Sequence, residues 1–434
     1  MNNQKTKKKP TSFSSRIPRW ERLDNTAHLF PVIAGESLTN VYRISVKLTE
    51  QIEPELLQEA LDIVLPKFDG FNLRMRQGFF WHYMEENGKP APTVLEENAF
   101  PCRFIRQNKN NSYMFRVTYF KNRINLEVFH VLADGMGGIT FLKEIVYQYL
   151  RLKHPSICAD NALSLDTSLN REDSFIKNYK QSASRGYASQ KAYILKGEML
   201  PKGEFGVMHG YMSIKQLKEV CHRYEVSINE YFVSAYAYAL YLEYMHKMPS
   251  KRPIRIAVPV NLRPFYKSNT TKNFFVMVSA VFHPTEDNYS FADVCRIIKK
   301  SLREQINQEH LEKLFSYNVS NEKLFIARLV PLALKSFAIS YIYTKSALAN
   351  TTTITNVGNV TVEDAYKPYI ENFHAFLAMS KGQHIKGAIC SYEDTLIFSF
   401  SYDLMDVSLQ KAFFRQLSSD GLDIQLETNG VSYE

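Results

Sequence analysis

Residues 129–135 read FHVLADG, and this stretch joins a strongly patterned strand to a sharp turn. Two apolar and aromatic runs, at residues 114–120 and 124–130, are separated by Lys-Asn-Arg at 121–123, which predicts a β-hairpin. Alternate residues of the second run are apolar, and His130 continues their face of the strand. We therefore expect the His130 imidazole to point inward from the end of a strand.

After this turn the sequence changes to the period of a helix, with apolar residues three and four apart over residues 139–150. His130 is therefore predicted on a loop between a strand and a helix. The glycines at this point, Gly135, Gly137 and Gly138, remove side chains from the turn. A turn without side chains would let a substrate approach the backbone and the positive end of the helix.

A histidine on the apolar face of a strand has two interpretations. Such a side chain is often a core residue whose hydrogen bonds are satisfied within the protein. A metal site is not expected, because His130 and Asp134 straddle a glycine turn and no third ligand lies close in sequence. From the strand pattern alone, a structural and a catalytic histidine both stay open.

The spacing of His130, Asp134 and Gly135 resembles the HxxxDG signature of the chloramphenicol-acetyltransferase-like acyltransferases. This group includes peptide-synthetase condensation domains, wax-ester synthases and alcohol acetyltransferases. Further segments match the group in the same order along the chain: FNLR at 71–74, VPVNLR at 258–263, NFF at 273–275 and TNVGN at 355–359. The resemblance covers about residues 19–426 and favours the catalytic interpretation of His130.

One position departs from the condensation domains. Those domains usually carry a second histidine immediately before the catalytic one, and this chain has Phe129 there. The departure favours a likeness to the alcohol acetyltransferase branch over peptide-bond formation on carrier proteins.

The resemblance implies an α/β fold of the α+β sandwich type, in which two chloramphenicol-acetyltransferase-like lobes form a pseudo-dimer with an active-site tunnel at their interface. No literal repeat is visible in the sequence, so the duplication depends on the resemblance. We expect an N-terminal lobe with the motif and a crossing segment at residues 16–185, and a C-terminal lobe at 186–434. An internally duplicated chain has less reason to oligomerise, and we expect a monomer.

Length and composition agree with two lobes. A chain of 434 residues exceeds what one core usually supports, and its 45% of hydrophobic residues can supply two. The longest apolar region, residues 325–343, is interrupted by Arg328, Pro331 and Lys335, which predicts a buried helix and no membrane span. No apolar run follows the N-terminal lysines, so residues 1–15 are interpreted as a disordered basic tail and not as a signal peptide or anchor.

The cysteines and the net charge limit the cellular compartment and the partners that we expect. The five cysteines contain no CxxC pair, so neither a disulfide framework nor a zinc ribbon is expected, and the cytoplasm is the expected compartment. The net charge of +9 comes from scattered residues without a nucleic-acid motif, so no nucleic-acid partner is expected. A modest basic excess is compatible with binding the phosphates of coenzyme A.

Other patterned segments are assigned to the two lobes. The first lobe is expected to contain a strand at 44–48, an amphipathic helix at 54–65, and strands at 73–84 around Gly78, before a polar, serine-rich crossing at 154–203. The second is expected to contain a strand at 207–212, helices from Ser213 and Ser227 with capping-box partners Gln216 and Glu230, a central strand at 254–260, helical residues at 291–318, and paired strands at 387–390 and 395–402.

The resemblance implies that His130 is the general base. A neutral imidazole would remove the proton of an alcohol or amine acceptor as it attacks the carbonyl of an acyl-CoA thioester, with acetyl-CoA the first candidate. The unperturbed imidazole pKa of about 6.5 suits this task at cellular pH. No permanently bound cofactor is expected.

Asp134 has two possible roles. It could orient His130 as in a catalytic triad, whereas in the family the equivalent Asp points away from the His and pairs with an arginine that fixes the loop. Arg74 and Arg263 both match that arginine, and the sequence does not choose between them.

Three further residues are candidates for the tunnel wall. They are Asn273, Asn356 and Gly358. The Asn356 side chain and the Gly135 backbone N–H are two alternative donors to the tetrahedral oxyanion. The segment around Asn356 also has the composition of an ordinary turn.

Three classes of function stay open. The leading one is a CoA-dependent O-acyltransferase that acts on a small-molecule acceptor. The alternatives are a transferase of natural-product assembly that takes its donor from an acyl-carrier protein, and a binding relative without catalysis. The sequence reports neither the acceptor nor the length of the acyl chain.

Overall fold

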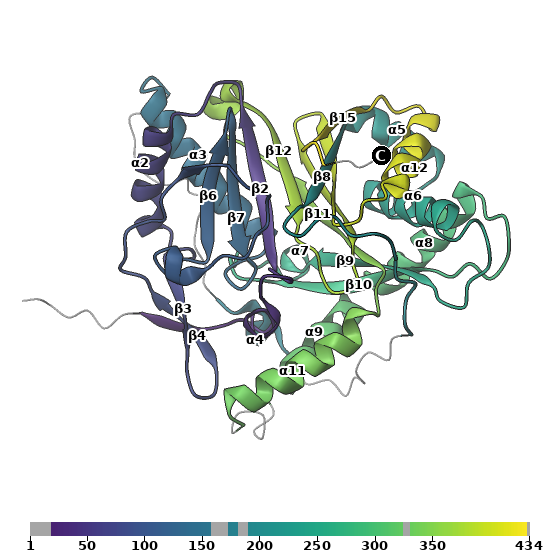
Figure 1. Cartoon of the computed structure of the whole chain (residues 1–434), viewed down its shortest axis with the longest axis horizontal. Helices are drawn as coiled ribbons and strands as arrows, with labels where there is room; N and C mark the ends of the chain where they lie inside the picture. Colours follow the sequence, from purple (N-terminus) through teal and green to yellow (C-terminus); the bar gives the residue numbers. More distant parts are fainter. Residues whose placement is uncertain (1–18, 158–171, 181–189, 324–329, 432–434) are drawn as a thin grey trace, which may run out of the picture.

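The computed structural model describes residues 19–157, 172–180, 190–323 and 330–431. Figure 1 shows two lobes side by side, each with a β-sheet whose outer face is covered by helices. The basic tail expected at residues 1–15 and much of the crossing segment lie outside the described residues. Within that segment a short helix, α4 (Ser174–Asn178), is described.

The first lobe is built on a mixed five-stranded sheet with the order β12-β2-β7-β6-β5. The predicted hairpin is confirmed, because the two strands that flank residues 121 and 122 pair antiparallel. A smaller three-stranded sheet, β1-β4-β3, lies beside it. The strands are β1 (Trp20–Arg22), β2 (Val41–Leu48), β3 (Leu73–Gln77), β4 (His82–Glu86), β5 (Leu95–Glu96), β6 (Phe115–Phe120), β7 (Arg123–Phe129) and β12 (Ile370–Leu377).

Two helices, α2 (Pro54–Val64) and α3 (Gly135–Lys153), cover the outer face of this sheet (Figure 1). The predicted apolar stripe of α2 is buried, and the helix ends just before Pro66, as expected. Aromatic rings pack α3 against the sheet: Phe141 meets Phe115 of β6 edge-on with ring centroids 5.2 Å apart, and it also stacks on Phe71, just before β3, at 4.0 Å. The remaining short elements of the lobe are α1 (Phe30–Ile33), η1 (Leu65–Lys67) and η2 (Gln107–Lys109).

The second lobe is built on a mixed seven-stranded sheet with the order β10-β9-β11-β13-β14-β8-β15. The predicted paired strands are β13 and β14, which run antiparallel. The strands are β8 (Gly206–Ser213), β9 (Ile254–Asn261), β10 (Phe275–Phe282), β11 (Thr352–Asn359), β13 (Ile385–Tyr392), β14 (Thr395–Tyr402) and β15 (Gln425–Thr428).

Helices cover the outer face of this second sheet, and N-cap residues mark where two of them begin. Ser227 and Glu230 form the predicted capping box of α6 (Ile228–Glu243). Ser213 caps α5 (Ile214–Arg223), but Gln216 donates to Asp423 at 2.8 Å, so only half of the expected box is described there. The other elements of this lobe are α7 (Arg263–Tyr266), α8 (Phe291–Gln305), α9 (Gln308–Lys323) and α12 (Ser408–Ser419). The short helix η4 (Asp364–Tyr369) belongs to the first lobe, where Tyr366 stacks on Tyr147 of α3 with ring centroids 4.0 Å apart.

The helical region at residues 291–318 is two helices, α8 and α9. Ile306 leaves the helical conformation, with φ −91° and ψ 71°. The side chain of Asn307 then accepts a hydrogen bond from the backbone of His310 at 2.9 Å. An asparagine that satisfies a free backbone N–H in this way favours a new helix start.

The prediction of a buried helix at residues 325–343 is wrong for the part that the structure describes. Helix α11 (Leu332–Ala347) lies at the periphery of the molecule (Figure 1) and leaves large apolar side chains in solvent, with Phe337 78% exposed. An apolar sequence predicts burial only if neighbouring elements surround the helix, and here the packing covers one side. No helix among the described residues combines the length and the apolar character needed to cross a membrane.

Strand β12 connects the two lobes. It comes from the C-terminal half of the chain, yet it pairs with β2 of the first sheet, with Phe373 opposite Val46. It also lies against the second sheet, where His374 Nε2 is 2.8 Å from the hydroxyl of Tyr211. The boundary expected between residues 185 and 186 does not anticipate this exchange, because strand pairing depends on tertiary position and not on order in the chain.

Candidate active site

His130 lies immediately after β7, and its backbone N–H donates to the carbonyl of Asn40 at 3.0 Å. Four residues later Asp134 caps α3, where its carboxylate accepts from the N–H of Gly137 at 3.2 Å. The predicted loop between strand and helix is therefore present. Its two ends are fixed by strand pairing and by the helix cap.

The His130 ring is hydrogen-bonded through Nδ1, which lies 3.1 Å from Oδ1 of Asn273. Asn273 donates from Nδ2 to Asp24 at 2.8 Å and to the His130 carbonyl at 3.3 Å, which identifies Oδ1 as its acceptor atom. Because an amide oxygen only accepts, Nδ1 carries the ring proton. This arrangement leaves Nε2 as the basic nitrogen.

Aromatic rings surround the imidazole. Phe30 stacks on it at a centroid distance of 4.8 Å, Tyr42 meets it edge-on at 5.1 Å, and Phe275 lies at 5.7 Å. Burial lowers the pKa of His130 below its ordinary value of 6.5, and the nearby Asp134 charge opposes this shift. Burial disfavours the imidazolium, so the neutral base predominates at neutral pH.

Asp134 pairs with Arg263 and not with Arg74. The Arg263 guanidinium donates to both carboxylate oxygens, at 2.8 and 3.1 Å. The N–H of Phe274 adds a third hydrogen bond at 3.2 Å. Arg74 instead pairs with Glu85 on the β3–β4 hairpin, 2.9 Å away. Asp134 thus ties the His130 loop to the connection between β9 and β10 in the other lobe.

Asp24 belongs to this group, and sequence reasoning missed it. Its carboxylate accepts from Asn273 and, at 2.8 Å, from the N–H of Ala27. Burial raises the pKa of Asp24 to about 6, against the lowering effect of the Asn273 hydrogen bond. Asp24 is almost 250 residues from Asn273 in sequence and carries no local motif, so no pattern could have linked them.

The glycines of the turn do not all have the role expected from the sequence. Gly135 lines the cavity next to His130. A Cβ on Gly137 would lie 2.6 Å from the carbonyl oxygen of Thr271, and one on Gly138 would lie 2.7 Å from the Tyr42 hydroxyl. These two glycines permit close packing of the protein on itself, because the helix start approaches other backbone and side chains there. The interpretation that they open the turn to a substrate is wrong.

Asn356 and Gly358 lie on β11. Asn356 is exposed and lines the cavity, and its Oδ1 accepts from the N–H of Gly358 at 2.8 Å. Gly358 has φ +88° at an irregularity in the pairing of β11 with β13, a conformation that favours glycine. Asn356 therefore lies at the cavity wall, on an irregular strand and not in an ordinary turn.

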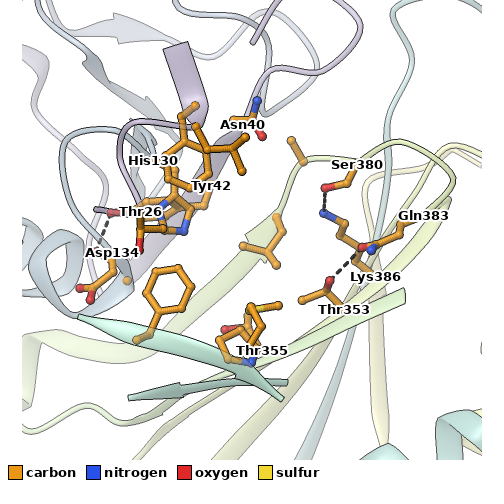
Figure 2. A pocket seen from close by; sticks show the side chains of 18 of the residues that line it. Thr26, Asn40, Tyr42, His130, Asp134, Thr353, Thr355, Ser380, Gln383 and Lys386 are labelled. Atoms are coloured by element: carbon orange, nitrogen blue, oxygen red, sulfur yellow. Dashed lines mark hydrogen bonds between the residues drawn. The ribbon is translucent and has the colours of Figure 1, made fainter. Parts of the chain in front are cut away.

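The cavity between the lobes has a volume of about 470 Å³ and is lined from both halves of the chain. Figure 2 shows two groups of polar side chains across it: His130, Tyr42 and Asp134 on one side, and Lys386 with Ser380 on the other. The sequence did not single out Lys386, which comes from β13. The described residues contain no cluster of three or more side chains that could hold a metal ion.

No protein-family profile matches this chain, and no curated protein matches it in sequence. Among solved structures, TRI3 trichothecene 15-O-acetyltransferase from Fusarium sporotrichioides is 11% identical, with a TM-score of 0.63 over 95% of this chain and 96% of that one. TRI101 of F. sporotrichioides, solved with coenzyme A and T-2, is 10% identical, with a TM-score of 0.63 over 94% and 99% of the two chains.

The first condensation domain of the calcium-dependent antibiotic synthetase, solved with a substrate analogue, is 11% identical, with a TM-score of 0.63 over 95% of this chain and all of that one. These likenesses extend over nearly the whole of each chain. They show that the fold is that of condensation domains and of these acetyltransferases, as the HxxxDG resemblance implied.

Proposed function

We propose that this chain, which has the fold of condensation domains and trichothecene acetyltransferases, transfers an acyl group from a thioester to an alcohol or amine, with His130 as general base. One observation carries the proposal. Asn273 holds the Nδ1 proton of His130, which leaves Nε2 basic at the edge of a cavity between the lobes. The cavity is within the range of size that small-molecule sites have.

The chemistry needs one proton acceptor and two aligned substrates. Nε2 of His130 takes the proton of the acceptor hydroxyl or amine as the acceptor's heteroatom bonds to the thioester carbonyl carbon. The tetrahedral intermediate then expels the thiolate, which receives the same proton from the imidazolium. General-base assistance contributes roughly 100- to 10,000-fold, and alignment of the two substrates in the cavity supplies the remainder.

Two groups can stabilise the oxyanion of that intermediate. Gly135 is the first residue of α3, and backbone N–H groups of a first helical turn have no acceptor within the helix. The side chain of Asn356 uses its oxygen for Gly358, so its amide nitrogen remains a donor at the cavity wall. Both positions agree with an oxyanion site, and the choice between them depends on the pose of the substrate.

Asp134 and Arg263 have a positioning role in this mechanism. Their bidentate pair occupies both oxygens of the carboxylate, so Asp134 is not the partner of the His130 ring. The pair fixes the loop that carries His130 relative to Asn273, because Arg263 and Asn273 both belong to the connection between β9 and β10.

The donor we favour is a coenzyme A thioester, and acetyl-CoA is the first to test. TRI101, one of the proteins that share the fold, was solved with coenzyme A, and the net charge of +9 suits an anionic donor. Phe129 also replaces the first histidine that is usual in condensation domains. A donor borne on an acyl-carrier protein is the alternative, and the likeness to a condensation domain supports testing it.

The test measures release of free thiol from acetyl-CoA and longer acyl-CoAs with a panel of alcohols and amines. Wild type is compared with His130→Ala and with His222→Ala, which removes an exposed histidine at the end of α5. We expect acceptor-dependent release that falls by roughly 100- to 10,000-fold in His130→Ala and is unchanged in His222→Ala.

Retention of acceptor-dependent release in His130→Ala would overturn its role as base. Release only from an acyl-carrier protein would identify the carrier-borne donor. Absence of release with both kinds of donor, together with ligand binding that survives in His130→Ala, would indicate a binding protein without catalysis.

A further inference from the structure

Lys386 lies in the cavity opposite His130. It is part of β13, is only 5% exposed, and contributes to the cavity wall. Figure 2 shows it grouped with Ser380, Gln383 and Thr353, across the cavity from the His130 side. The mechanism proposed above gives this group no task.

Lys386 does not use all of its hydrogen-bond donors. An ammonium has three donors, and Nζ donates to Oγ of Ser380 at 2.6 Å. Among the residues that the structure describes, Lys386 makes no ion pair with a carboxylate. Asp403 is the acid whose charge acts on it, but that carboxylate binds His384 Nδ1 at 3.0 Å.

The neighbours of Lys386 are hydrogen-bond donors and not acids. Gln383 accepts from the Thr353 hydroxyl through Oε1 at 2.8 Å, which leaves its Nε2 group as a second donor. The cavity is lined by Lys381 and Arg263 as well as Lys386, whereas Asp134 is its one acidic residue within the described chain. Arg263 already neutralises that carboxylate. The Lys386 end therefore has positive charge and donors without an anion.

A buried lysine in this position is costly unless an anion accompanies it. Burial lowers the pKa of Lys386 to about 7, and the charge of Asp403 opposes the shift only in part. An oxygen anion beside Nζ would restore the charged form and complete its hydrogen bonds. This is the environment that a carboxylate needs in order to be recognised away from bulk water.

We propose that Lys386, Ser380 and Gln383 form a subsite for a carboxylate carried by the substrate. The inference deepens the proposed acyl transfer and depends on it. The phosphates of coenzyme A are separated from its sulfur by the long pantetheine arm, so an anion held inside the same cavity as His130 belongs to the acceptor or to the acyl group. The substrate class is then a hydroxy or amino acid as acceptor, or a dicarboxylic acyl thioester as donor.

Two matched pairs of substrates show whether the acceptor or the acyl group carries the carboxylate. As acceptors with acetyl-CoA, 6-hydroxyhexanoate is compared with 1,6-hexanediol. As donors to 1-hexanol, succinyl-CoA is compared with butyryl-CoA. Wild type, Lys386→Met and Lys218→Met are assayed by thiol release, and Lys386→Gln replaces the methionine variant if that variant does not fold. Lys218 is a fitting control because it is an exposed lysine of α5 and does not line the cavity.

We expect the carboxylated member of one pair to lose roughly 10- to 100-fold in kcat/KM in Lys386→Met. The kcat/KM of its neutral match, and all values in Lys218→Met, should stay unchanged. The affected pair identifies the substrate that carries the carboxylate. An equal loss for both members of each pair, or no loss, would overturn the subsite.

Direct binding keeps the test valid if wild type releases no thiol from any donor. That result would count against the proposed transfer and not against the subsite. Calorimetric titration with 6-hydroxyhexanoate and 1,6-hexanediol then decides. Binding of the carboxylate that weakens roughly 10- to 100-fold in Lys386→Met supports the subsite, and equal affinities in both proteins overturn it.

Discussion

The two ends of the cavity satisfy their polar groups in opposite ways. At one end, Asn273 binds the His130 ring and Arg263 binds both oxygens of Asp134. At the other end, Lys386 has a single hydrogen bond, to Ser380, and no ion pair among the described residues. A side chain that takes part in a reaction benefits from partners that fix its position. A side chain that binds a substrate needs hydrogen-bond donors that the protein itself does not use. We therefore separate a catalytic end from a binding end.

The two ends also differ in where their residues come from. The His130 end combines the loop after β7, the segment around Asp24, and the connection between β9 and β10. The Lys386 end is local, since Ser380, Gln383 and Lys386 lie within seven residues of the chain. The hydrogen bonds of the His130 end thus depend on the docking of the lobes, whereas the Lys386–Ser380 hydrogen bond joins residues that are near in the chain. The following predictions test this contrast, from the largest expected effect to the smallest.

Asp134→Ala is expected to have the largest effect on stability. Removing one member of a buried pair leaves the Arg263 charge uncompensated, which costs about 3 to 5 kcal/mol in the free energy of unfolding, and activity falls with it. Urea unfolding measures the change. Arg74→Ala is the matched control, because the Arg74–Glu85 pair is partly exposed and should contribute at most about 1 kcal/mol. A stable but inactive Asp134→Ala protein would contradict the positioning role and favour a triad.

Lys386→Met is expected to change stability in the opposite direction. Replacing a buried ammonium that lacks a carboxylate partner by an apolar side chain removes its desolvation cost. The free energy of unfolding should therefore rise, by about the 1 to 4 kcal/mol found when buried ion pairs are replaced by apolar residues. The folded-state pKa of about 7 lies below the ordinary 10.5, so the cost of the lysine is fully present below pH 7 and disappears as the pH rises toward 10.5.

Chemical denaturation of wild type and Lys386→Met at several pH values checks the direction in which their difference in stability changes with pH. The extra stability of the variant should shrink between pH 7 and 10.5, whereas Lys218→Met should show no such trend. An advantage that is constant with pH, or a destabilised variant, would show that Lys386 is satisfied in the absence of substrate and would weaken the contrast between the ends.

Asn273→Ala tests how His130 is held. Loss of the hydrogen bond from Nδ1 frees the ring to turn, and Asp24 loses its side-chain donor while keeping the backbone N–H of Ala27. We therefore expect kcat to fall roughly 10- to 100-fold with little change in KM. Steady-state kinetics separates the two parameters. A rise in KM with unchanged kcat would make Asn273 a substrate-binding residue, as the sequence had it, and not a positioning residue.

The pH profile of wild type gives the smallest expected effect. Burial lowers the pKa of His130 below 6.5, so kcat/KM should be flat above that pH and should fall as the pH drops through the lowered pKa, where the base becomes protonated. A buffer series from pH 5 to 8 measures this limb. An inflection above pH 6.5 would mean that the charged imidazole is favoured at this end.

Local patterns in the sequence were enough to place His130 between a strand and a helix. The hairpin that ends at His130 was predicted from alternation, and the cap of α6 from Ser227 and Glu230. The HxxxDG resemblance implied the fold, and it gave Arg263 as one of two candidate partners for Asp134. These features are readable because alternation, helical period and capping involve residues that are neighbours in the chain.

Other features depend on residues that are distant in sequence. The contact of Asp24 with Asn273, the exchange of β12 into the first sheet, and the exposure of α11 have no local signature. Lys386 reads as an ordinary lysine until the fold buries it beside Ser380 and opposite His130. The sequence alone determined where His130 lies and how the strand and helix on either side of it form, because those depend on short-range geometry. Tertiary structure decided which partners hold that base and which charge faces it across the cavity, because burial and pairing arise only when the two lobes meet.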